Sequence, residues 1–268
     1  MQNEANSGMK VLKVKINNFK KKIKITFFKA TKSLVNGIYP NDLVCLDCSG
    51  ELRTANEKYL SICDVCSNDL PFRKGRHCKF CGAYIIESDG SDCQDCKRLA
   101  PHFSQVLAPF EYKGVIEKII YEYKKAGKTF LYLYFARYIT DFFKNSNVNV
   151  DFVTSVPMMK KQIMKNGFDH LKPITDYFEN ETRIPQISPL CRTMDQPERK
   201  TDLDRFTQYE NVYGVFSMAP GFNIDIIKDK TIVIIDDVVV TGATENACAR
   251  VLKENGAANV IVLSLARV

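Results

Sequence analysis

The stretch Ile232–Thr244 constrains the fold of this chain more than any other part of the sequence. Apolar, β-branched residues lead directly into two aspartates, and three valines and a Thr-Gly-Ala-Thr turn follow. A continuous β-branched run is typical of a strand that is buried on both faces of a parallel sheet. Apolar residues then recur at helical spacing over residues 243–255, and Gly256 is placed to end that helix. The order predicts a β-loop-α unit, which Val260–Leu265 extends with another buried strand.

The same stretch predicts a binding site for a sugar phosphate. Asp236 and Asp237 are expected at the carboxyl end of the strand, where open α/β sheets bind ligands. Carboxylates accept hydrogen bonds from sugar hydroxyls, and Gly242 permits a tight turn that lets the backbone approach a ligand. The N-terminus of the helix offers N–H groups and a positive dipole end to a phosphate. The alternative is an ordinary Rossmann-like strand that ends in two aspartates, but the whole pattern is more specific than a lone glycine loop.

Eight of the ten cysteines form four C-x-x-C pairs. This spacing lets two thiolates face one ion, and four thiolates complete the tetrahedral shell of Zn²⁺. We therefore expect one or two structural zinc sites, with sequential pairing as a double zinc ribbon and cross-braced pairing as the alternative. Disulfides and redox centres compete with zinc, but the lack of a secretory signal favours a reducing cytosol and a cytoplasmic protein. The expected ligands are Cys45, Cys48, Cys63, Cys66, Cys78, Cys81, Cys93 and Cys96.

Positive charge is concentrated at the N-terminus. The chain has a formal net charge of +7, whereas residues 1–40 alone hold nine lysines against one glutamate. Attraction to DNA or to an anionic membrane surface is therefore expected to reside in Lys10–Lys32. A solvated tail without a partner is the alternative.

The sequence divides into three parts. Residues 1–40 are the basic extension, residues 41–100 are the cysteine module, and residues 101–268 are expected to form the main domain. Alternating strand and helix patterns in the main domain predict an α/β fold with a mostly parallel sheet. The expected elements are helices at Val115–Lys124, Thr129–Phe143 and Phe168–Phe178, strands at Phe152–Val156, Val212–Phe216 and Thr231–Ile235, and a helix or loop at Arg199–Tyr209.

The stretch Ile232–Thr244 resembles the phosphoribosyl diphosphate (PRPP) motif of type I phosphoribosyltransferases. The resemblance implies that Asp236 and Asp237 contact the ribose hydroxyls, which makes them the candidate catalytic residues. It also implies that Val240, Thr241, Gly242, Ala243 and Thr244 surround the 5′-phosphate. Valine stands at position 240 where the family usually has threonine or serine, which removes a hydroxyl contact on the order of 1 kcal/mol. The implied chemistry is displacement at the anomeric carbon, with Mg²⁺ holding the charge of the diphosphate.

A cysteine module ahead of this motif resembles the ComF family, which is associated with DNA uptake in naturally competent bacteria. The resemblance covers roughly residues 34–268, including G-I-Y-P, Y-K-K-A-G-K, S-V-P, N-V-Y-G-V-F and the final L-A-R-V. K-N-G-F-D-H departs from the family pattern at Lys165-Asn166, Asp169 and His170. The analogy implies a diphosphate loop at Ser155, Val156, Pro157, Met158 and Met159, for which a plain strand end is the alternative. Arg192, Lys200 and Arg205 are candidates for neutralising phosphate, for which a solvated charged loop is the alternative.

These features favour a competence-type protein that binds PRPP with Mg²⁺ and assists the uptake of single-stranded DNA. The alternatives are a phosphoribosyltransferase of nucleotide or base salvage and a regulator that senses PRPP without catalysis. The expected partners are PRPP, single-stranded DNA and competence DNA-translocation proteins at the inner membrane, to which the protein would be peripheral. No segment indicates the acceptor, so the sequence leaves enzymatic turnover open.

Overall fold

The computed structural model describes residues 44–54, 57, 60–85, 92–125, 127–159, 161, 163–164, 167–194 and 205–268. The basic extension expected at residues 1–40 lies outside them. Contacts group the chain into two compact units, Met1–Cys45 with Ser49–Cys63, and Leu46–Cys48 with Asp64–Val268. The division of the sequence at residues 40 and 100 stays a prediction.

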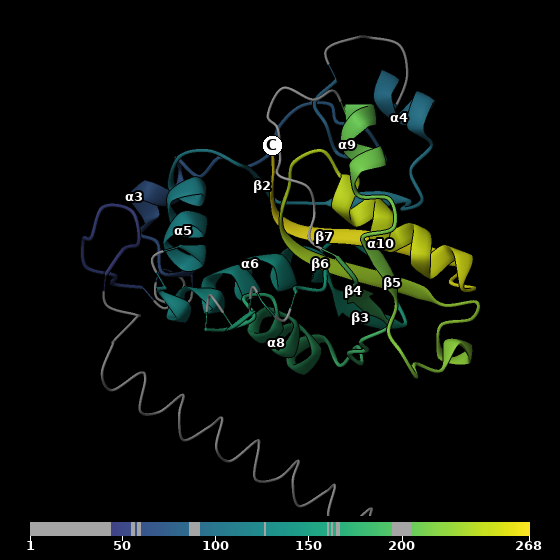
Figure 1. The fold of residues 1–268 in the computed structure, drawn as a ribbon. Helices are drawn as coiled ribbons and strands as arrows, with labels where there is room; N and C mark the ends of the chain where they lie inside the picture. Colours follow the sequence, from purple (N-terminus) through teal and green to yellow (C-terminus); the bar gives the residue numbers. More distant parts are fainter. Residues whose placement is uncertain are drawn as a thin grey trace, which may run out of the picture. The chain divides into compact units, whose positions relative to one another are not determined.

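A parallel sheet forms the centre of the second unit, with β6 and β7 in the middle (Figure 1). β7 pairs with β1 and β2 on one side and with β6 on the other, and β6 pairs with β3. Every pairing in this sheet is parallel, which confirms the expected fold class. The strands are β1 (Gln105–Leu107), β2 (Phe110–Glu111), β3 (Phe152–Ser155), β6 (Thr231–Val239) and β7 (Asn259–Arg267).

The core of this unit is built on the two central strands. Residues 232–235 of β6 and 260–263 of β7 are at most 2% exposed. Full burial of such side chains contributes about 1.5–3 kcal/mol each. β6 also runs four residues beyond the expected end at Ile235, because Val238 and Val239 continue the ladder opposite Ala266 and Arg267. The two aspartates therefore lie within the strand rather than after it.

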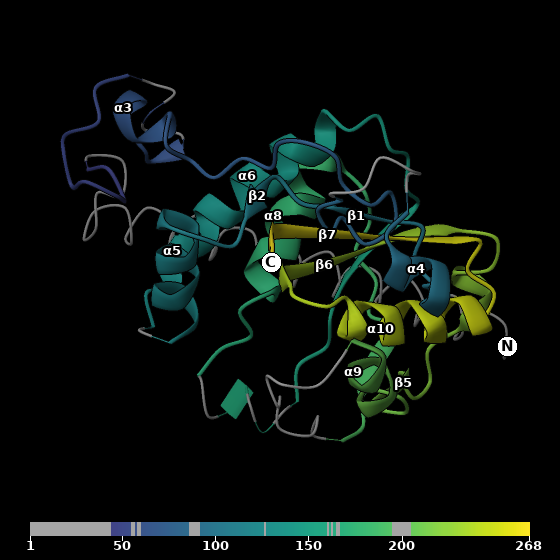
Figure 2. The ribbon, with the colours of Figure 1, turned by 90° about the horizontal axis from the view of Figure 1, so that it is seen from above.

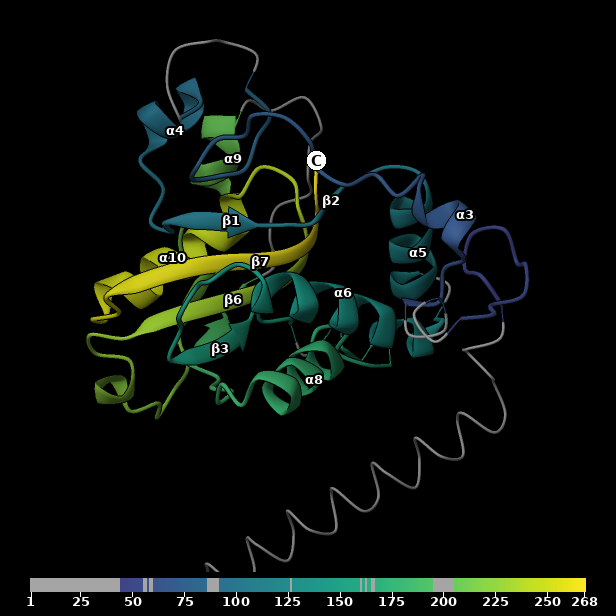
Figure 3. The same ribbon diagram turned by 180° about the vertical axis from the view of Figure 1, so that it is seen from behind.

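Helices cover both faces of the sheet. Figure 2 shows α9 (Arg205–Asn211) and α10 (Ala243–Glu254) on one side of β6 and β7, and α6 (Tyr132–Lys144) on the other. Figure 3 shows α8 (Lys172–Thr182) packed beside α6. The other helical segments within the described residues are α3 (Asp64–Ser67), α4 (Gln94–Leu99), α5 (Val115–Lys124), η1 (Thr129–Leu131) and η2 (Ile224–Ile226).

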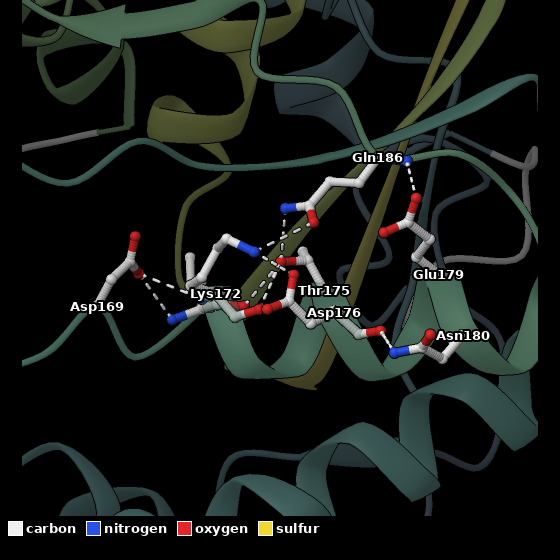
Figure 4. A network of polar contacts seen from close by, with 8 residues as sticks. Asp169, Lys172, Thr175, Asp176, Glu179, Asn180 and Gln186 are labelled. Atoms are coloured by element: carbon white, nitrogen blue, oxygen red, sulfur yellow. Dashed lines mark hydrogen bonds and ion pairs between the residues drawn. The ribbon is translucent and has the colours of Figure 1, made fainter. Parts of the chain in front are cut away.

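The helix expected from Phe168 begins only at Lys172, and its start has local causes. The Asp169 carboxylate accepts hydrogen bonds from the N–H groups of Leu171 and Lys172, at 3.0 and 3.3 Å. Proline at position 173 falls in the first turn, where its missing N–H costs nothing. Farther along the helix, Thr175 Oγ1 accepts a hydrogen bond from the Gln186 amide, at 3.0 Å (Figure 4). Because Gln186 bridges to β3, these contacts fix α8 against the sheet.

A second, antiparallel pair joins β4 (Leu190–Arg192) to β5 (Phe216–Met218). The strand expected at Val212–Phe216 is wrong in its placement, because residues 212–215 form a turn and the strand begins at Phe216. Gly214 in this turn has φ of 78°, a left-handed conformation that interrupts an extended strand.

The second half of the cysteine module is hydrogen-bonded to the edge of the parallel sheet. Val106 N–H in β1 donates to the Phe80 carbonyl at 2.7 Å, and Glu111 N–H in β2 donates to the Pro71 carbonyl at 2.8 Å. The Arg73 N–H donates to the Pro109 carbonyl at 3.0 Å. These bonds satisfy backbone groups that an edge strand would otherwise expose. Across the described parts of the chain, no helix combines the length and apolarity that crossing a bilayer requires.

Candidate functional site

Asp237 lies in β6 at the centre of an ionic cluster. Its side chain is 4% exposed, and its Oδ2 lies 2.6 Å from Lys124 Nζ and 2.9 Å from His170 Nε2. Its Oδ1 accepts a hydrogen bond from the Val238 N–H at 2.7 Å. Burial by itself raises the pKa of Asp237, but the Lys124 ammonium and then His170 outweigh burial and lower it below its ordinary value. Asp237 is therefore held as a carboxylate.

Asp236 is in the opposite electrostatic state. Its Oδ1 accepts a hydrogen bond from the Asp237 N–H at 2.8 Å, and its carboxyl is hydrogen-bonded to Glu245 of α10. Burial, then repulsion by Asp237, then Glu245 raise the pKa of Asp236 well above its ordinary value. A hydrogen bond between two carboxyl groups requires a proton on one of them. The fold thus favours the protonated form of Asp236 and the ionised form of Asp237.

The loop between β6 and α10 has the geometry of a tight turn into a helix. Gly242 is the N-cap of α10 with φ of 83° and ψ of 4°, a left-handed conformation that glycine adopts at no steric cost. The Ala243 N–H donates to Thr241 Oγ1 at 3.4 Å, and the Asn246 N–H donates to the Gly242 carbonyl at 2.8 Å. We call Val240–Thr244 the predicted phosphate loop, because its contact with a phosphate stays a prediction.

A cavity of about 440 Å³ opens beside the two aspartates. It brings together site residues that the sequence separates, namely Asp236, Asp237, Val240 and Thr244 with Val156, Pro157, Met158 and Arg192. Within the described residues, Ser155, Met159, Thr241, Gly242 and Ala243 do not line it. Lys200 lies outside the described residues, and Arg205 is described only as the first backbone position of α9. The cavity has the size of an ordinary small-molecule pocket.

The lining of the cavity also includes cationic and aromatic side chains. Lys124 and Lys125 come from the end of α5, and Tyr112 and Tyr121 contribute aromatic rings. Basic groups facing a carboxylate pair suit a ligand that carries both phosphates and hydroxyls. Lys124, His170 and Glu245 were not predicted as site residues from the sequence. Y-K-K-A-G-K and K-N-G-F-D-H contain Lys124 and His170, but neither motif shows that these residues meet at Asp237.

Two groups of cysteines are arranged for metal binding. The first cysteine cluster is Cys45, Cys48, Cys63 and Cys66, and the second is Cys78, Cys81, Cys93 and Cys96. In each cluster the sulfur atoms lie within 4.8 Å of one another. A tetrahedral zinc site with Zn–S bonds of about 2.3 Å places its sulfurs about 3.8 Å apart, and the Cys81 and Cys93 sulfurs are 3.7 Å apart. The grouping confirms sequential pairing of the four C-x-x-C pairs.

The loops around the second cysteine cluster direct N–H groups at the sulfurs. The Ala83 N–H donates to Cys81 Sγ and the Cys96 N–H donates to Cys93 Sγ, both at 3.4 Å. Gly82 follows Cys81 with φ of 68°, which the turn between ligands requires. In the first unit, the Cys63 N–H donates to Cys45 Sγ at 3.4 Å. Such bonds favour thiolates, the form that binds a metal.

No family model matches the chain. Over 228 residues it is 19% identical to Competence protein F of Haemophilus influenzae, covering 83% of this chain and 96% of that protein. The resemblance to the ComF family is confirmed.

Parts of the chain are similar in sequence to proteins of solved structure, with low TM-scores. The chain is 20% identical to glutamine PRPP amidotransferase from B. subtilis, covering 47% of this chain and 24% of that one, with a TM-score of 0.31. It is 14% identical to hypoxanthine-guanine phosphoribosyl transferase from L. donovani, covering 48% and 65%, with a TM-score of 0.28. The ComF-like chain thus spans about a quarter of the amidotransferase. Likenesses of this size add nothing to the topology described above.

Proposed function

We propose that this ComF-like chain binds PRPP together with Mg²⁺ in the cavity beside Asp236 and Asp237. The observation that supports the proposal is the convergence of three parts on one cavity of about 440 Å³. These parts are the two aspartates of β6, Val240 and Thr244 at the two ends of the predicted phosphate loop, and residues 156–158 after β3. Parallel sheets place such groups together at their carboxyl ends.

Each part has a separate task in this proposal. The aspartates accept hydrogen bonds from the ribose hydroxyls, and the predicted phosphate loop receives the 5′-phosphate with its backbone N–H groups. Lys124, Lys125 and Arg192 face the cavity and offset the charge of the diphosphate. The carboxylates also fit Mg²⁺, which prefers oxygen ligands and binds through one or two carboxylates plus substrate phosphates. When bound, Mg²⁺ stabilises the negative charge on the diphosphate as it departs.

The proposal extends to the role of the protein in the cell and to zinc. We propose that the chain assists uptake of single-stranded DNA, which the similarity to Competence protein F supports. Lys10–Lys32, outside the described residues, is the proposed contact with DNA or with translocation proteins at the inner membrane. Zn²⁺ in both cysteine clusters has a structural role, because four cysteine ligands leave no open position for a substrate.

Calorimetry with PRPP and Mg²⁺ tests the pocket. The double variant Asp236→Asn/Asp237→Asn loses two charge-assisted acceptors, so we expect its affinity to fall by at least roughly tenfold. Asp225→Asn is the matched control, because Asp225 is exposed in η2 and absent from the cavity lining. No binding by the wild-type chain, or equal affinity in wild type and double variant, contradicts the proposal. Diphosphate release in the presence of a panel of bases then separates a transferase from a non-catalytic PRPP sensor.

A further inference from the structure

Arg267 connects the second cysteine cluster to the predicted phosphate loop. It is the last residue of β7 and is 6% exposed. Its Nε donates a hydrogen bond to the Cys81 carbonyl at 3.0 Å, although Cys81 lies 186 residues away in the sequence. Its Nη1 donates to the Val239 carbonyl at 3.4 Å and to the carbonyls of Val240 and Val268. One side chain therefore contacts both a cysteine of the metal cluster and the entry to the loop.

Within the described part of the chain, the side chain of Arg267 donates to main-chain oxygens rather than to an aspartate or glutamate. A second guanidinium lies near the same turn, since Arg73 donates to the Gly82 carbonyl. Burial, and then repulsion by Arg267, lower the pKa of Arg73. Buried charges are costly unless they are compensated. A Zn²⁺ ion with four thiolates carries a net charge of −2, which would add to the negative charge of Glu111 near these two arginines.

The contacts of Arg267 also orient the backbone of the loop. In a trans peptide unit the C=O and the following N–H point in opposite directions. Fixing the Val240 carbonyl against Arg267 therefore turns the Thr241 N–H away from Arg267. The Val239 carbonyl is held twice, because it also accepts the Val268 N–H at 3.0 Å. The direction of the first loop N–H groups thus depends on where the guanidinium sits.

We propose that Arg267 is a positioning residue that couples metal occupancy of the second cysteine cluster to the conformation of the predicted phosphate loop. With metal bound, the turn from Cys78 to Cys81 is fixed, so the Cys81 carbonyl holds the guanidinium against Val240. Without metal, Arg267 loses this fixed acceptor, and the loop entry loosens. The proposal rests on the proposed function only in identifying Val240–Thr244 as the loop that receives phosphate.

Amide hydrogen exchange of the loop tests this coupling in the full chain without PRPP. We compare zinc-loaded and chelator-treated wild type with Arg267→Lys, which keeps the charge but loses the fork of donors. Arg250→Gln is the matched control, because Arg250 lies on α10 and pairs with the exposed side chain of Glu254, at 2.8 Å. Amides of the β6–β7 core serve as the reference for global unfolding. Zinc per chain is measured for every variant.

In wild type, metal removal should raise loop exchange by roughly tenfold or more, the effect of losing a hydrogen bond to a charged group. In zinc-loaded Arg267→Lys, loop exchange should already be raised while core exchange and zinc content stay as in wild type. Arg250→Gln should behave as wild type.

Equal loop exchange in zinc-loaded wild type and zinc-loaded Arg267→Lys overturns the proposal, even if metal removal unfolds the whole chain. A wild-type loop that is indifferent to metal overturns it as well. A failure of PRPP to bind contradicts the proposed function alone, because the exchange measurement contains no PRPP.

Discussion

Asp236→Asn and Asp237→Asn are expected to change stability in opposite directions at neutral pH. Asp237 is 4% exposed and is paired with Lys124 at 2.6 Å, so removing its charge leaves a lysine facing a neutral amide. Removing one partner of a fully buried pair costs about 3–5 kcal/mol. The Lys124 side chain is 34% exposed and keeps part of its hydration, so we discount the loss to about 1–3 kcal/mol.

Asp236 differs because the fold opposes its ionisation through burial, Asp237 and Glu245. An amide at this position ends the repulsion and still hydrogen-bonds, so we expect Asp236→Asn to stabilise the chain by about 0.5–2 kcal/mol. For a unit of this size each kcal/mol moves the melting temperature by about 2–4 °C. The assay is thermal unfolding of both single variants and wild type at pH 7.

The pH dependence provides a second measure of the same reasoning. The pKa of Asp237 is lowered in the folded state, so its stabilising effect is present above about pH 4 and is lost as pH falls through the folded value. The pKa of Asp236 is raised, so its effect is destabilising and grows as pH rises above about 4. The reasoning is refuted if both variants are equally destabilised at pH 7, or if Asp237→Asn is as stable as wild type. Either result would mean that the pKa values of Asp236 and Asp237 are not shifted in opposite directions.

Four further predictions concern the metal, the loop, the basic extension and proton release. Metal analysis of purified protein should give two zinc ions per chain, and the double variant Cys93→Ser/Cys96→Ser should bind only one. Fewer than one zinc ion per wild-type chain contradicts the predicted zinc sites. Gly242→Ala places a residue with a Cβ atom in the left-handed conformation at φ of 83°, so the free energy of unfolding should fall by about 1–2 kcal/mol. Chemical denaturation measures this loss, and an unchanged midpoint contradicts the left-handed conformation of residue 242. Deletion of residues 1–33 should weaken single-stranded DNA binding and flatten its salt dependence, whereas an unchanged salt slope excludes the extension as the contact. If PRPP binds next to ionised Asp236, binding should release protons, because the pKa of Asp236 is raised in the free chain. Glu245→Gln should reduce that release, because it removes one cause of the raised pKa. Calorimetry in buffers of different ionisation enthalpy counts the protons, and net uptake by wild type argues against ionisation of Asp236.

The parts of the fold that the sequence predicted well are those set by local pattern. β6, α10 and β7 follow one another with strong periodicity, so their order and approximate bounds were predictable. The start of α8 and the place of β5 were missed, because a short cap at Asp169 and a turn at Gly214 outweigh the apolar pattern around them.

Contacts made by distant residues were beyond prediction from the sequence. Asp237 was a predicted site residue, but its partners Lys124 and His170 come from the end of α5 and from the turn before α8. Only the packing of those elements against β6 brings the three groups together. Periodicity reports which face of an element is buried and not which side chain it meets. His170 was noted only as a departure from the family pattern, whereas the structure places its Nε2 2.9 Å from Asp237 Oδ2.

The second half of the cysteine module is hydrogen-bonded to the sheet edge and, through Arg267, to the strand that leads into the predicted phosphate loop. A chain beginning at Pro101 would remove the Phe80 and Pro71 carbonyls, which accept the N–H groups of Val106 and Glu111 along the sheet edge. It would also remove the Cys81 carbonyl that Arg267 contacts while holding Val240. Each buried donor left without an acceptor lowers the free energy of unfolding by about 1–3 kcal/mol. Such a chain is therefore expected to be less stable at the sheet edge formed by β1 and β2. In the sequence the metal-binding and ligand-binding motifs are far apart, but hydrogen bonds join them in the fold. A mutation in either motif is therefore expected to change the stability of the other.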